Sequence, residues 1–527
     1  MSPLRDRPFH PGALQPGAIR PGGLRPAGLR LSGLLLAASL ALMAAPLVPL
    51  LGSLPALADD AEVLVDGARI DAELRSEYLV GEQVRVPITV ANPGAAPVRF
   101  ADLSARPWLV RFEFTGADGT KLRRSTAAPA QDDGRTVQIP VRGQRRTLLE
   151  APGAEATAPG EYQLAVQLVR GDQVTDIRRQ TVRFSTPKVA AVDLGPDAIA
   201  GSKVGVQSAW VHRATQGADL YLHQARGDDP TAGGASRHLA HLDAVVQPWL
   251  AAARAADAQS PVVAWAAGPR SLRVLQVDQT GVVATDRTVG LPWPAAEIAG
   301  RPGLAAGGVV GVPLWIADPD GQGGELRVAT LGPGDKLGFA AVSRFDQRPA
   351  SLRTMVDASG AVQLLISHAG GLDLYTLRGS TAVGAEALPL AGRRLVAAQA
   401  GSSILSARFG VVPQSDAHAG GVAVFAVVQD ATGVAGQWLD LRGNRIAATA
   451  PVALPAGATV AGAHVTPAGN LALLLRNGAA LSWMDGARRL PLGNVSDPVD
   501  VITDAQGRAV LRASSGVAPV TTRSLAP

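Results

Sequence analysis

The chain contains no cysteine, and this absence excludes several kinds of chemistry. Disulfide bonds, thiolate metal sites, a thiol nucleophile and the lipid-bearing cysteine of a lipoprotein are all ruled out. Aromatic residues make up only 4% of the 527 residues although hydrophobic residues make up 47%, so aliphatic side chains must fill the cores. A chain of this length can supply more than one such core without covalent cross-links.

Glycine and proline are abundant instead, at 59 and 39 residues. Residues of these two types punctuate a chain with tight turns, and such frequent punctuation suits many short strands better than long helices. The composition therefore predicts an all-β protein.

The first 58 residues have the pattern of an export signal. Residues 1–30 are rich in arginine and proline, residues 31–45 form an uncharged apolar run, and Ala56-Leu57-Ala58 supplies small residues at a cleavage site. An uncleaved membrane anchor is the alternative, but prolines interrupt the apolar run after residue 45. We expect cleavage near Ala58 and a periplasmic or secreted mature chain without a transmembrane segment.

The basic character of the chain resides largely in this leader. Its removal takes away five arginines and one aspartate, which leaves 44 basic and 43 acidic residues. A nearly neutral chain without a lysine and arginine stripe lacks the electrostatic footprint of phosphate-backbone binding. The sequence therefore indicates no nucleic-acid partner.

Residues 60–187 contain segments in which apolar and polar residues alternate, as expected of half-buried strands. The predicted strands are Val63–Ile70, Gln83–Val90, Trp108–Phe114, Gln163–Leu168 and Thr181–Phe184. Glycine-rich turns separate them. This region is predicted to be a β-sandwich.

One motif in this region resembles a known domain class. Pro159-Gly160-Glu161-Tyr162 is similar to the entry to a late strand in immunoglobulin-like and fibronectin-like bacterial domains. The resemblance implies that Tyr162 caps a corner of an Ig-like sandwich. It also implies a spacer or docking role, with no chemistry of its own.

Residues 203–527 contain an internal repeat of a turn followed by an apolar strand. Three segments superpose, beginning at Asp357, Thr466 and Asp504, and each places a glycine at the fourth position. The second strands of the repeating unit are expected near residues 207, 262, 311, 361, 421, 470 and 508. This spacing fits four-stranded propeller blades.

The pattern resembles exported β-propeller proteins, and it favours seven blades, with six or eight as alternatives. Residues 188–202 are either a linker or a strand that completes the last unit and closes the ring. The chain lacks the paired motifs of WD-repeat proteins, the aspartate box of sialidases and the tryptophan docking motifs of quinone-dependent dehydrogenases. The resemblance therefore implies a fold and no particular activity.

Four histidines lie close together in the sequence and are candidate metal ligands: His212, His223, His238 and His241. A two-residue hairpin at Gln216-Gly217 would place two of them on one sheet face, with His212 opposite Tyr221. Neutral imidazoles suit zinc or copper. The alternative is a set of solvent-facing histidines, because the helix and glutamate of a metalloprotease motif are missing.

Tryptophans recur at matched positions of the repeat. Trp210, Trp265 and Trp315 fall on successive second strands, and Trp438 and Trp483 fall on third strands. They could form an aromatic funnel that stacks on flat ligands. Packing of one blade on the next is the interpretation that we favour.

The sequence assigns no catalytic residue and no required cofactor. It favours a non-enzymatic binding or scaffold protein of the cell envelope, whose partner is an envelope protein or an extracellular ligand. A carbohydrate-active or metal-assisted hydrolase on the propeller funnel is the alternative, and an envelope assembly factor is a third hypothesis. Convergence of two carboxylates or three histidines at the channel would favour the hydrolase.

Overall fold

The computed structural model describes most of the chain after the leader. The described ranges are 63–195, 207–225, 234–253, 260–278, 282–294, 296–333, 336–357, 359–378, 390–397, 401–411, 422–466, 469–486, 488–495, 499–503, 508–515 and 518–525. The predicted signal peptide lies outside them. Within these ranges the only helices are three single 3₁₀ turns, at Pro107–Leu109, Ala154–Ala156 and Ala306–Gly308. Among the residues described, no helix has the length and apolar character that crossing a membrane requires.

The first part of the described chain consists of two mainly antiparallel sheets and a small two-stranded ribbon. One sheet has the order β1 (Val63–Val65), β2 (Ala68–Ala72), β4 (Arg85–Ala91) and β9 (Gln144–Glu150). The other has the order β3 (Glu77–Leu79), β11 (Gln173–Ser185), β10 (Gly160–Arg170), β6 (Val110–Gly116) and β7 (Lys121–Arg124). The ribbon pairs β5 (Val98–Ala101) with β8 (Thr136–Ile139).

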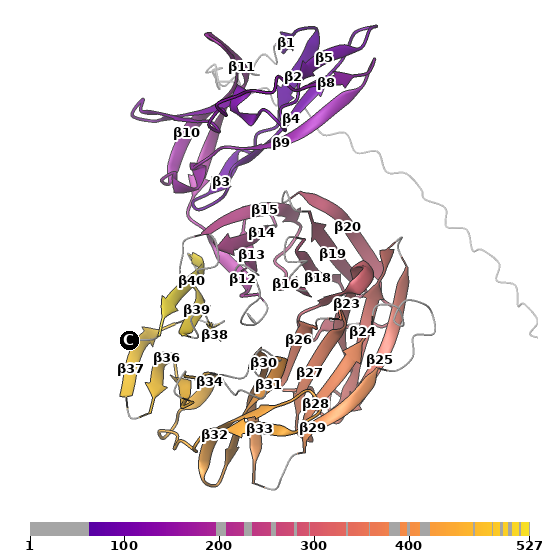
Figure 1. Cartoon of the computed structure of the whole chain (residues 1–527), viewed down its shortest axis with the longest axis vertical. Coiled ribbons are helices and arrows are strands. Elements are labelled where there is room, and N and C mark those ends of the chain that lie inside the picture. The colour runs from indigo at the N-terminus through magenta and orange to yellow at the C-terminus, as the bar shows by residue number, and fades with distance from the viewer. Residues whose placement is uncertain are drawn as a thin grey trace, which may run out of the picture. The chain divides into compact units, whose positions relative to one another are not determined.

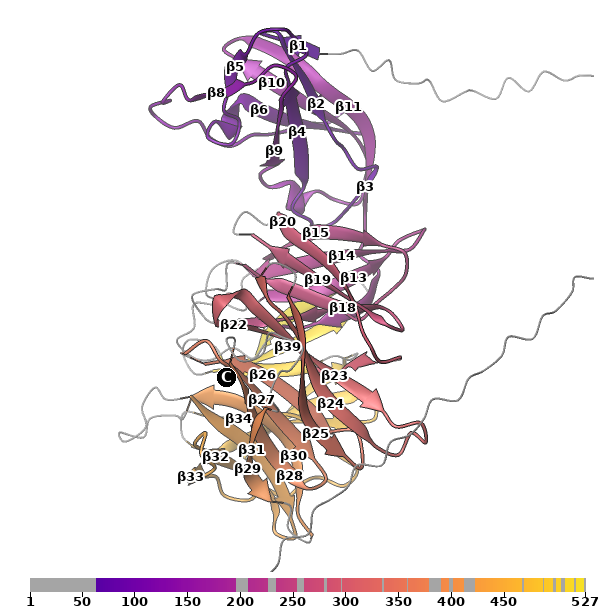
Figure 2. The same ribbon diagram turned by 90° about the vertical axis from the view of Figure 1, so that its right-hand side faces the viewer.

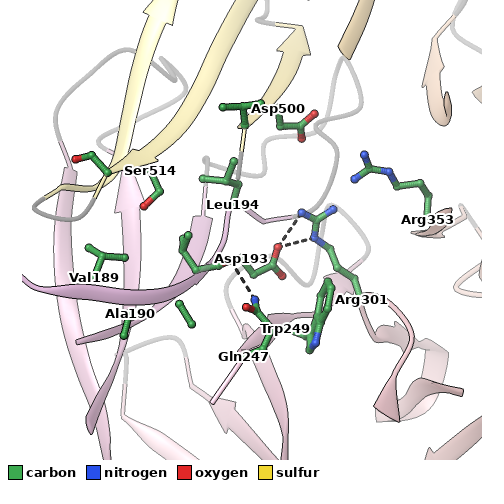
Figure 3. Close-up of a pocket in the computed structure, with 14 residues that line it drawn as sticks. Val189, Ala190, Asp193, Leu194, Gln247, Trp249, Arg301, Arg353, Asp500 and Ser514 are labelled. Carbon is green, nitrogen blue, oxygen red and sulfur yellow. Dashed lines mark hydrogen bonds and ion pairs between the residues drawn. The ribbon is translucent and has the colours of Figure 1, made fainter. Parts of the chain in front are cut away.

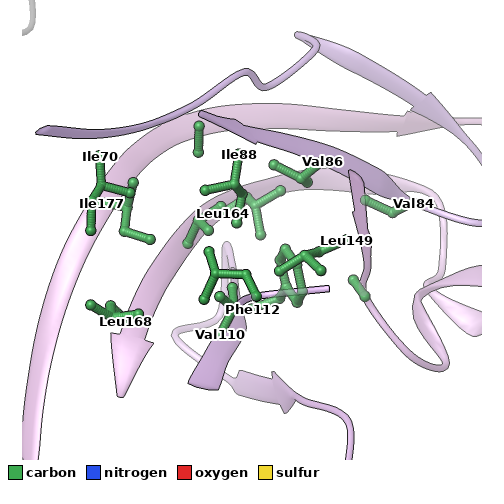
Figure 4. Packing of buried hydrophobic residues seen from close by; sticks show 14 of the residues in the cluster. Ile70, Val84, Val86, Ile88, Val110, Phe112, Leu149, Leu164, Leu168 and Ile177 are labelled. Carbon is green, nitrogen blue, oxygen red and sulfur yellow. The ribbon is translucent and has the colours of Figure 1, made fainter. Parts of the chain in front are cut away.

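The two sheets share one aliphatic and aromatic core. Every second residue of β4 is buried, so that Val86 and Ile88 point inward. Figure 4 shows them facing Leu164 and Phe112 of the other sheet. The predicted strand Val63–Ile70 is two strands, because a turn with left-handed backbone at Asp66 and Gly67 divides it. The sequence pattern missed this turn because the hydrophobic alternation continues across it.

Tyr162 lies at the start of β10, as predicted, and its hydroxyl donates a 3.1 Å hydrogen bond to the carbonyl oxygen of Ala158. Its ring packs edge-on against Phe184, with ring centroids 5.6 Å apart. The contact ties the chain entering β10 to the core of the sandwich. Membership of the Ig-like class stays a prediction.

Seven further sheets make up the rest of the described chain. In chain order the first three are β12 (Val189–Asp193), β13 (Gln207–Arg213), β14 (Ala218–Ala225) and β15 (Gly234–Leu242); β16 (Trp249–Leu250), β18 (Val262–Gly268), β19 (Ser271–Val277) and β20 (Val283–Gly290); and β22 (Gly303–Ala305), β23 (Val309–Ala317), β24 (Gly324–Leu331) and β25 (Leu337–Phe345), joined by β17 (Ala252–Ala253) and β21 (Glu297–Ile298).

The remaining four sheets follow the same meander. They are β26 (Ser351–Val356), β27 (Val362–His368), β28 (Gly371–Leu377) and β29 (Ala391–Ala397); β30 (Ser403–Val411), β31 (Val422–Asp430), β32 (Gly433–Leu439) and β33 (Arg445–Ala448); β34 (Thr459–Val465), β35 (Leu471–Asn477), β36 (Ala480–Asp485) and β37 (Arg488–Asn494); and β38 (Val499–Thr503), β39 (Ala509–Ser515) and β40 (Ala518–Ser524).

These seven sheets stand around a common axis, so the region is a β-propeller (Figure 1), and Figure 2 shows the same strands from the side. The second strands of the sheets are β13, β18, β23, β27, β31, β35 and β39, and they begin within two residues of the seven predicted positions. Separate apolar clusters join residues of neighbouring sheets. Aliphatic packing between sheets therefore stabilises the ring, as the low aromatic content required.

The seventh sheet has three strands in the part of the chain that the structure describes. The sequence suggested a strand within residues 188–202 as its completion, but β12 pairs with β13 in the first sheet instead. The described end of that segment meets the seventh sheet through a side chain: Arg512 of β39 donates to the carbonyl oxygen of Leu194 at 2.7 Å. A polar contact therefore joins the first and last sheets there.

Candidate functional site

A cavity of about 750 Å³ lies among the inner strands of the propeller, and its size is within the range of small-molecule sites. Strands from the first, second, fourth and seventh sheets contribute to its wall, together with the segment before β22 (Figure 3). It is lined by Val189, Ala190, Ala191, Val192, Asp193, Leu194, Gln247, Trp249, Arg301, Arg353, Val499, Asp500, Ser514 and Ser515.

Asp193 makes several polar contacts in the wall. One carboxylate oxygen accepts hydrogen bonds from Nε of Arg301 at 2.9 Å and from the amide of Gly195 at 3.1 Å, and the Arg301 Nη2 lies 2.8 Å away. The other oxygen accepts from the amide of Leu250 at 2.7 Å. Both oxygens of this buried carboxylate are therefore engaged, and the contacts link the first three sheets.

A second ion pair lies on the seventh sheet. The Nη2 of Arg512 is 2.9 Å from Oδ2 of Asp500, and the Arg512 side chain is 1% exposed. Burial would raise the pKa of Asp500, but Arg512, Arg353 and Arg301 together outweigh it and lower that pKa below its ordinary value. Asp500 is therefore ionised at neutral pH.

The cavity combines these charges with an apolar wall. Figure 3 shows the ring of Trp249 beside Arg301, while Leu194 and Val189 lie on the side of the first sheet. Gln247 is held by hydrogen bonds to the carbonyl oxygens of Val192 and Pro248, each 3.1 Å long. The site therefore offers arginine donors next to an aromatic and aliphatic surface.

The four predicted metal ligands do not form one group. In the strand register of β13 and β14, His212 lies opposite Asp219, and Trp210 rather than His212 lies opposite Tyr221. The predicted register is therefore wrong by two residues. The reason is the turn, which has four residues, 214–217, between the paired ends Arg213 and Ala218. The faces are unchanged by a shift of two, but the histidines are farther apart along the strands.

Two of the four histidines do meet at a carboxylate. His238 Nε2 and His241 Nδ1 lie 3.2 Å and 3.0 Å from the same oxygen of Asp219. His223 instead contacts the hydroxyl of Ser236 at 3.2 Å, and His212 Nδ1 accepts from a backbone amide. No group of three or more histidine, aspartate or glutamate side chains within the described ranges could hold a metal ion. Zinc or copper binding stays a prediction without a geometric site.

The five repeated tryptophans lie on the predicted second and third strands and are buried. Trp265, Trp315 and Trp483 each belong to an apolar cluster that spans two sheets. These three therefore pack one sheet on the next, as we favoured, whereas Trp210 packs within the first sheet and against Leu79. Trp249, which the repeat did not single out, is the tryptophan that lines the cavity.

A second cluster of buried charge surrounds Glu82, which is 1% exposed. Its carboxylate accepts from the guanidinium of Arg75, from the amide of Leu79 at 2.9 Å and from the hydroxyl of Tyr221 at 3.4 Å. Burial raises the pKa of Glu82 to about 7, although Arg75 opposes the shift. No cavity described here reaches this cluster, so we interpret it as a structural tie between the β3–β4 turn and β14.

The cavity residues were not predicted from the sequence. Asp193, Arg301, Arg353 and Asp500 are separated by as many as about 300 positions, and no short motif contains two of them. The available signal was the position of inner strands in the repeat, since residues at matched places of different blades converge on the axis. The repeat pattern marks the second strands and does not define the inner ones.

The comparisons with known proteins concern the fold alone. The sequence matches no protein-family model and no curated protein. A quinoprotein alcohol dehydrogenase-like protein from Bacteroides thetaiotaomicron is similar in structure, with a TM-score of 0.32, 9% identity and coverage of 80% of this chain and 95% of its own.

Two propellers are also similar in structure. The Dos1 propeller has a TM-score of 0.30, 11% identity and coverage of 69% of this chain and 89% of its own. The propeller domain of the trilobed protease from Pyrococcus furiosus has a TM-score of 0.30, 10% identity and coverage of 83% and 98%. These scores are too low to carry an argument about function, which must come from the site.

Proposed function

We propose that the protein is an exported binding protein of the cell envelope that holds a small ligand in the cavity at the centre of its propeller. The observation that supports this proposal is the combination of a cavity of ligand size with charged groups that are fixed before any ligand arrives. Preorganised donors bind without the cost of ordering flexible side chains. The leader pattern supports the envelope location.

The hydrolase hypothesis also has an observation in its favour, because Asp193 and Asp500 line the same cavity. A glycosidase of the usual type needs one carboxylic acid that is protonated at neutral pH. Asp500 has a lowered pKa, and both oxygens of Asp193 are occupied by hydrogen bonds from Arg301 and from the amides of Gly195 and Leu250. The geometry therefore suits binding better than acid catalysis.

Native mass spectrometry of the mature chain after incubation with a small-molecule extract of the source cells tests the proposal. The wild type should retain a ligand, whereas Ala190→Trp, which fills the cavity from β12, should lose it. Val174→Trp is the control, because Val174 is 44% exposed on the sandwich. Retention by both variants, or no retained ligand in the wild type, would contradict the proposal.

A further inference from the structure

One strand of the cavity wall is connected directly to the sandwich. All five residues of β12, Val189–Asp193, line the cavity (Figure 3). This strand follows β11 of the sandwich after only three residues, 186–188. Pro187 in this connector is buried, and proline fixes the backbone angle φ. A connector that is this short and contains a proline leaves little freedom between β11 and β12.

The sandwich also packs against this strand through the side chain of Leu79, at the end of β3. Leu79 is 2% exposed, and the other buried members of its apolar cluster are propeller residues: Val192, Leu194, Trp210 and Tyr221. Two of these four, Val192 and Leu194, also line the cavity. A sandwich side chain therefore packs in the same cluster as the residues of the cavity wall.

Polar contacts hold the turn after Leu79 on the first propeller sheet. The amide of Ser236 on β15 donates to the carbonyl oxygen of Gly81 at 2.9 Å, and the amide of Gln83 donates to the carbonyl oxygen of Ser236 at 2.7 Å. The side chain of Gln83 accepts from Nε of Arg237 at 2.5 Å. The sandwich is therefore attached to the first sheet at β15 as well as at β12.

We propose that the sandwich positions the wall of the cavity, with Leu79 as the positioning residue that holds β12 in the shape that the ligand requires. This inference rests on the proposed function and gives the sandwich a role in the same site. Close-packed interiors transmit displacement, so a change at Leu79 shifts Val192 and Leu194. Because coupling between two sites is reciprocal, a ligand in the cavity should also stabilise the contact of β3 with the propeller.

Hydrogen exchange with mass spectrometry tests the effect on the wall without a ligand. Leu79→Ala leaves a cavity beside β12, so we expect the amides of residues 189–195 to exchange about tenfold faster or more. Leu79→Met conserves the volume and should behave like the wild type. Leu475→Ala is the matched control, because Leu475 is 1% exposed and the buried residues of its cluster lie in the fifth and sixth sheets. It should leave the exchange of residues 189–195 unchanged.

Native mass spectrometry after incubation with the small-molecule extract tests the effect on binding. We expect Leu79→Met and Leu475→Ala to retain the ligand, as the wild type does, and Leu79→Ala to lose it. In the wild type, the extract should also slow the exchange of residues 77–83 by about fivefold or more. Ala190→Trp should abolish this protection, since it fills the cavity.

Three results would overturn the inference: unchanged exchange of residues 189–195 in Leu79→Ala, retention of the ligand by that variant, or exchange of residues 77–83 that does not respond to a retained ligand. A circular dichroism spectrum like that of the wild type establishes that Leu79→Ala is folded, and Leu79→Val, which leaves a smaller cavity, replaces it otherwise. Each of these results leaves the difference between the wild type and Ala190→Trp intact. An absence of retained ligand in the wild type would instead refute the proposed function, and with it the role of Leu79 in binding.

Discussion

The guanidinium of Arg512 donates a 2.7 Å hydrogen bond to the carbonyl oxygen of Leu194, and these residues belong to the last sheet and the end of β12 in the first sheet. The same side chain pairs with Asp500 and is almost fully buried. In the part of the chain that the structure describes, the last sheet has three strands, and this contact joins it to the first sheet. Leu194 and Asp500 also line the cavity, so this contact and the proposed binding site share residues.

Arg512→Gln should lower stability more than the loss of a surface ion pair. Removing one partner of a buried pair typically costs about 3–5 kcal/mol, because the other charge is left unpaired. We expect a lower thermal midpoint and faster amide exchange in β38–β40, measured by calorimetry and by hydrogen exchange with mass spectrometry.

Arg344→Gln is the matched control, because an exposed pair contributes only about 0–1 kcal/mol. Equal effects of the two substitutions would show that the contact with Leu194 does not join the sheets.

His223 should make the protein less stable as the pH falls from about 6.5 to about 4. Burial lowers the pKa of His223 to about 4. Between pH 6.5 and 4, His223 therefore binds a proton in the unfolded chain but stays neutral in the folded chain. The stabilising contribution is complete above pH 6.5 and is lost as the pH falls to about 4, and it amounts to about 3 kcal/mol.

His223→Gln should flatten this part of the profile in urea unfolding experiments. Ser236→Ala is the control, because it removes the contact at 3.2 Å and keeps the imidazole. A profile of His223→Gln that is as steep as the wild type would refute the assignment.

Glu82 should contribute with the opposite sign. Burial raises its pKa to about 7, so its contribution is complete below pH 4.5 and is lost as the pH rises to about 7. Above about pH 7, where Glu82 is ionised, Glu82→Gln leaves Arg75 without its charged partner, so the variant should be less stable than the wild type there.

The variant should nevertheless lose less additional stability than the wild type between pH 4.5 and 7. Unfolding free energies at the two pH values measure this difference, with Glu297→Gln as the exposed control. An identical pH dependence in Glu82→Gln and the wild type would contradict the raised pKa.

Expression in a Gram-negative host should yield a mature chain that begins at Asp59. The apolar run and the small residues at positions 56 and 58 match the requirements of signal peptidase. Fractionation followed by intact-mass measurement tests this, and Ala58→Tyr should block the cleavage by placing a large side chain at the site. An uncleaved wild-type chain in the membrane fraction would favour the anchor alternative.

The predicted fold was largely confirmed because its signal is local. Three of the second strands follow a turn whose glycine is at the fourth position, and in the structure the amides of Gly360 and Gly469 close two of these turns onto Asp357 and Thr466. The inner strands carry no comparable mark. The sequence therefore left open whether residues 188–202 are a linker or a ring-closing strand, and in the structure β12 pairs with β13 of the first sheet.

The cavity could not be predicted because its residues act across long distances in the chain. Asp193 meets Arg301, and Arg512 meets Leu194, only after the ring has formed. The four candidate histidines lie near one another in the sequence. The turn between β13 and β14 has four residues rather than the predicted two, and this places the histidines of the two strands farther apart. The spacing of the histidines in the sequence predicted that they lie close together, but the register of the strands determines which side chains are in contact.

The most direct test of ligand binding in the propeller cavity is a crystal structure of the mature chain grown with the small molecule that native mass spectrometry finds retained. We expect ligand density in the cavity, in contact with the ring of Trp249. A ligand bound elsewhere, or a cavity filled only by water at a saturating concentration, would contradict it.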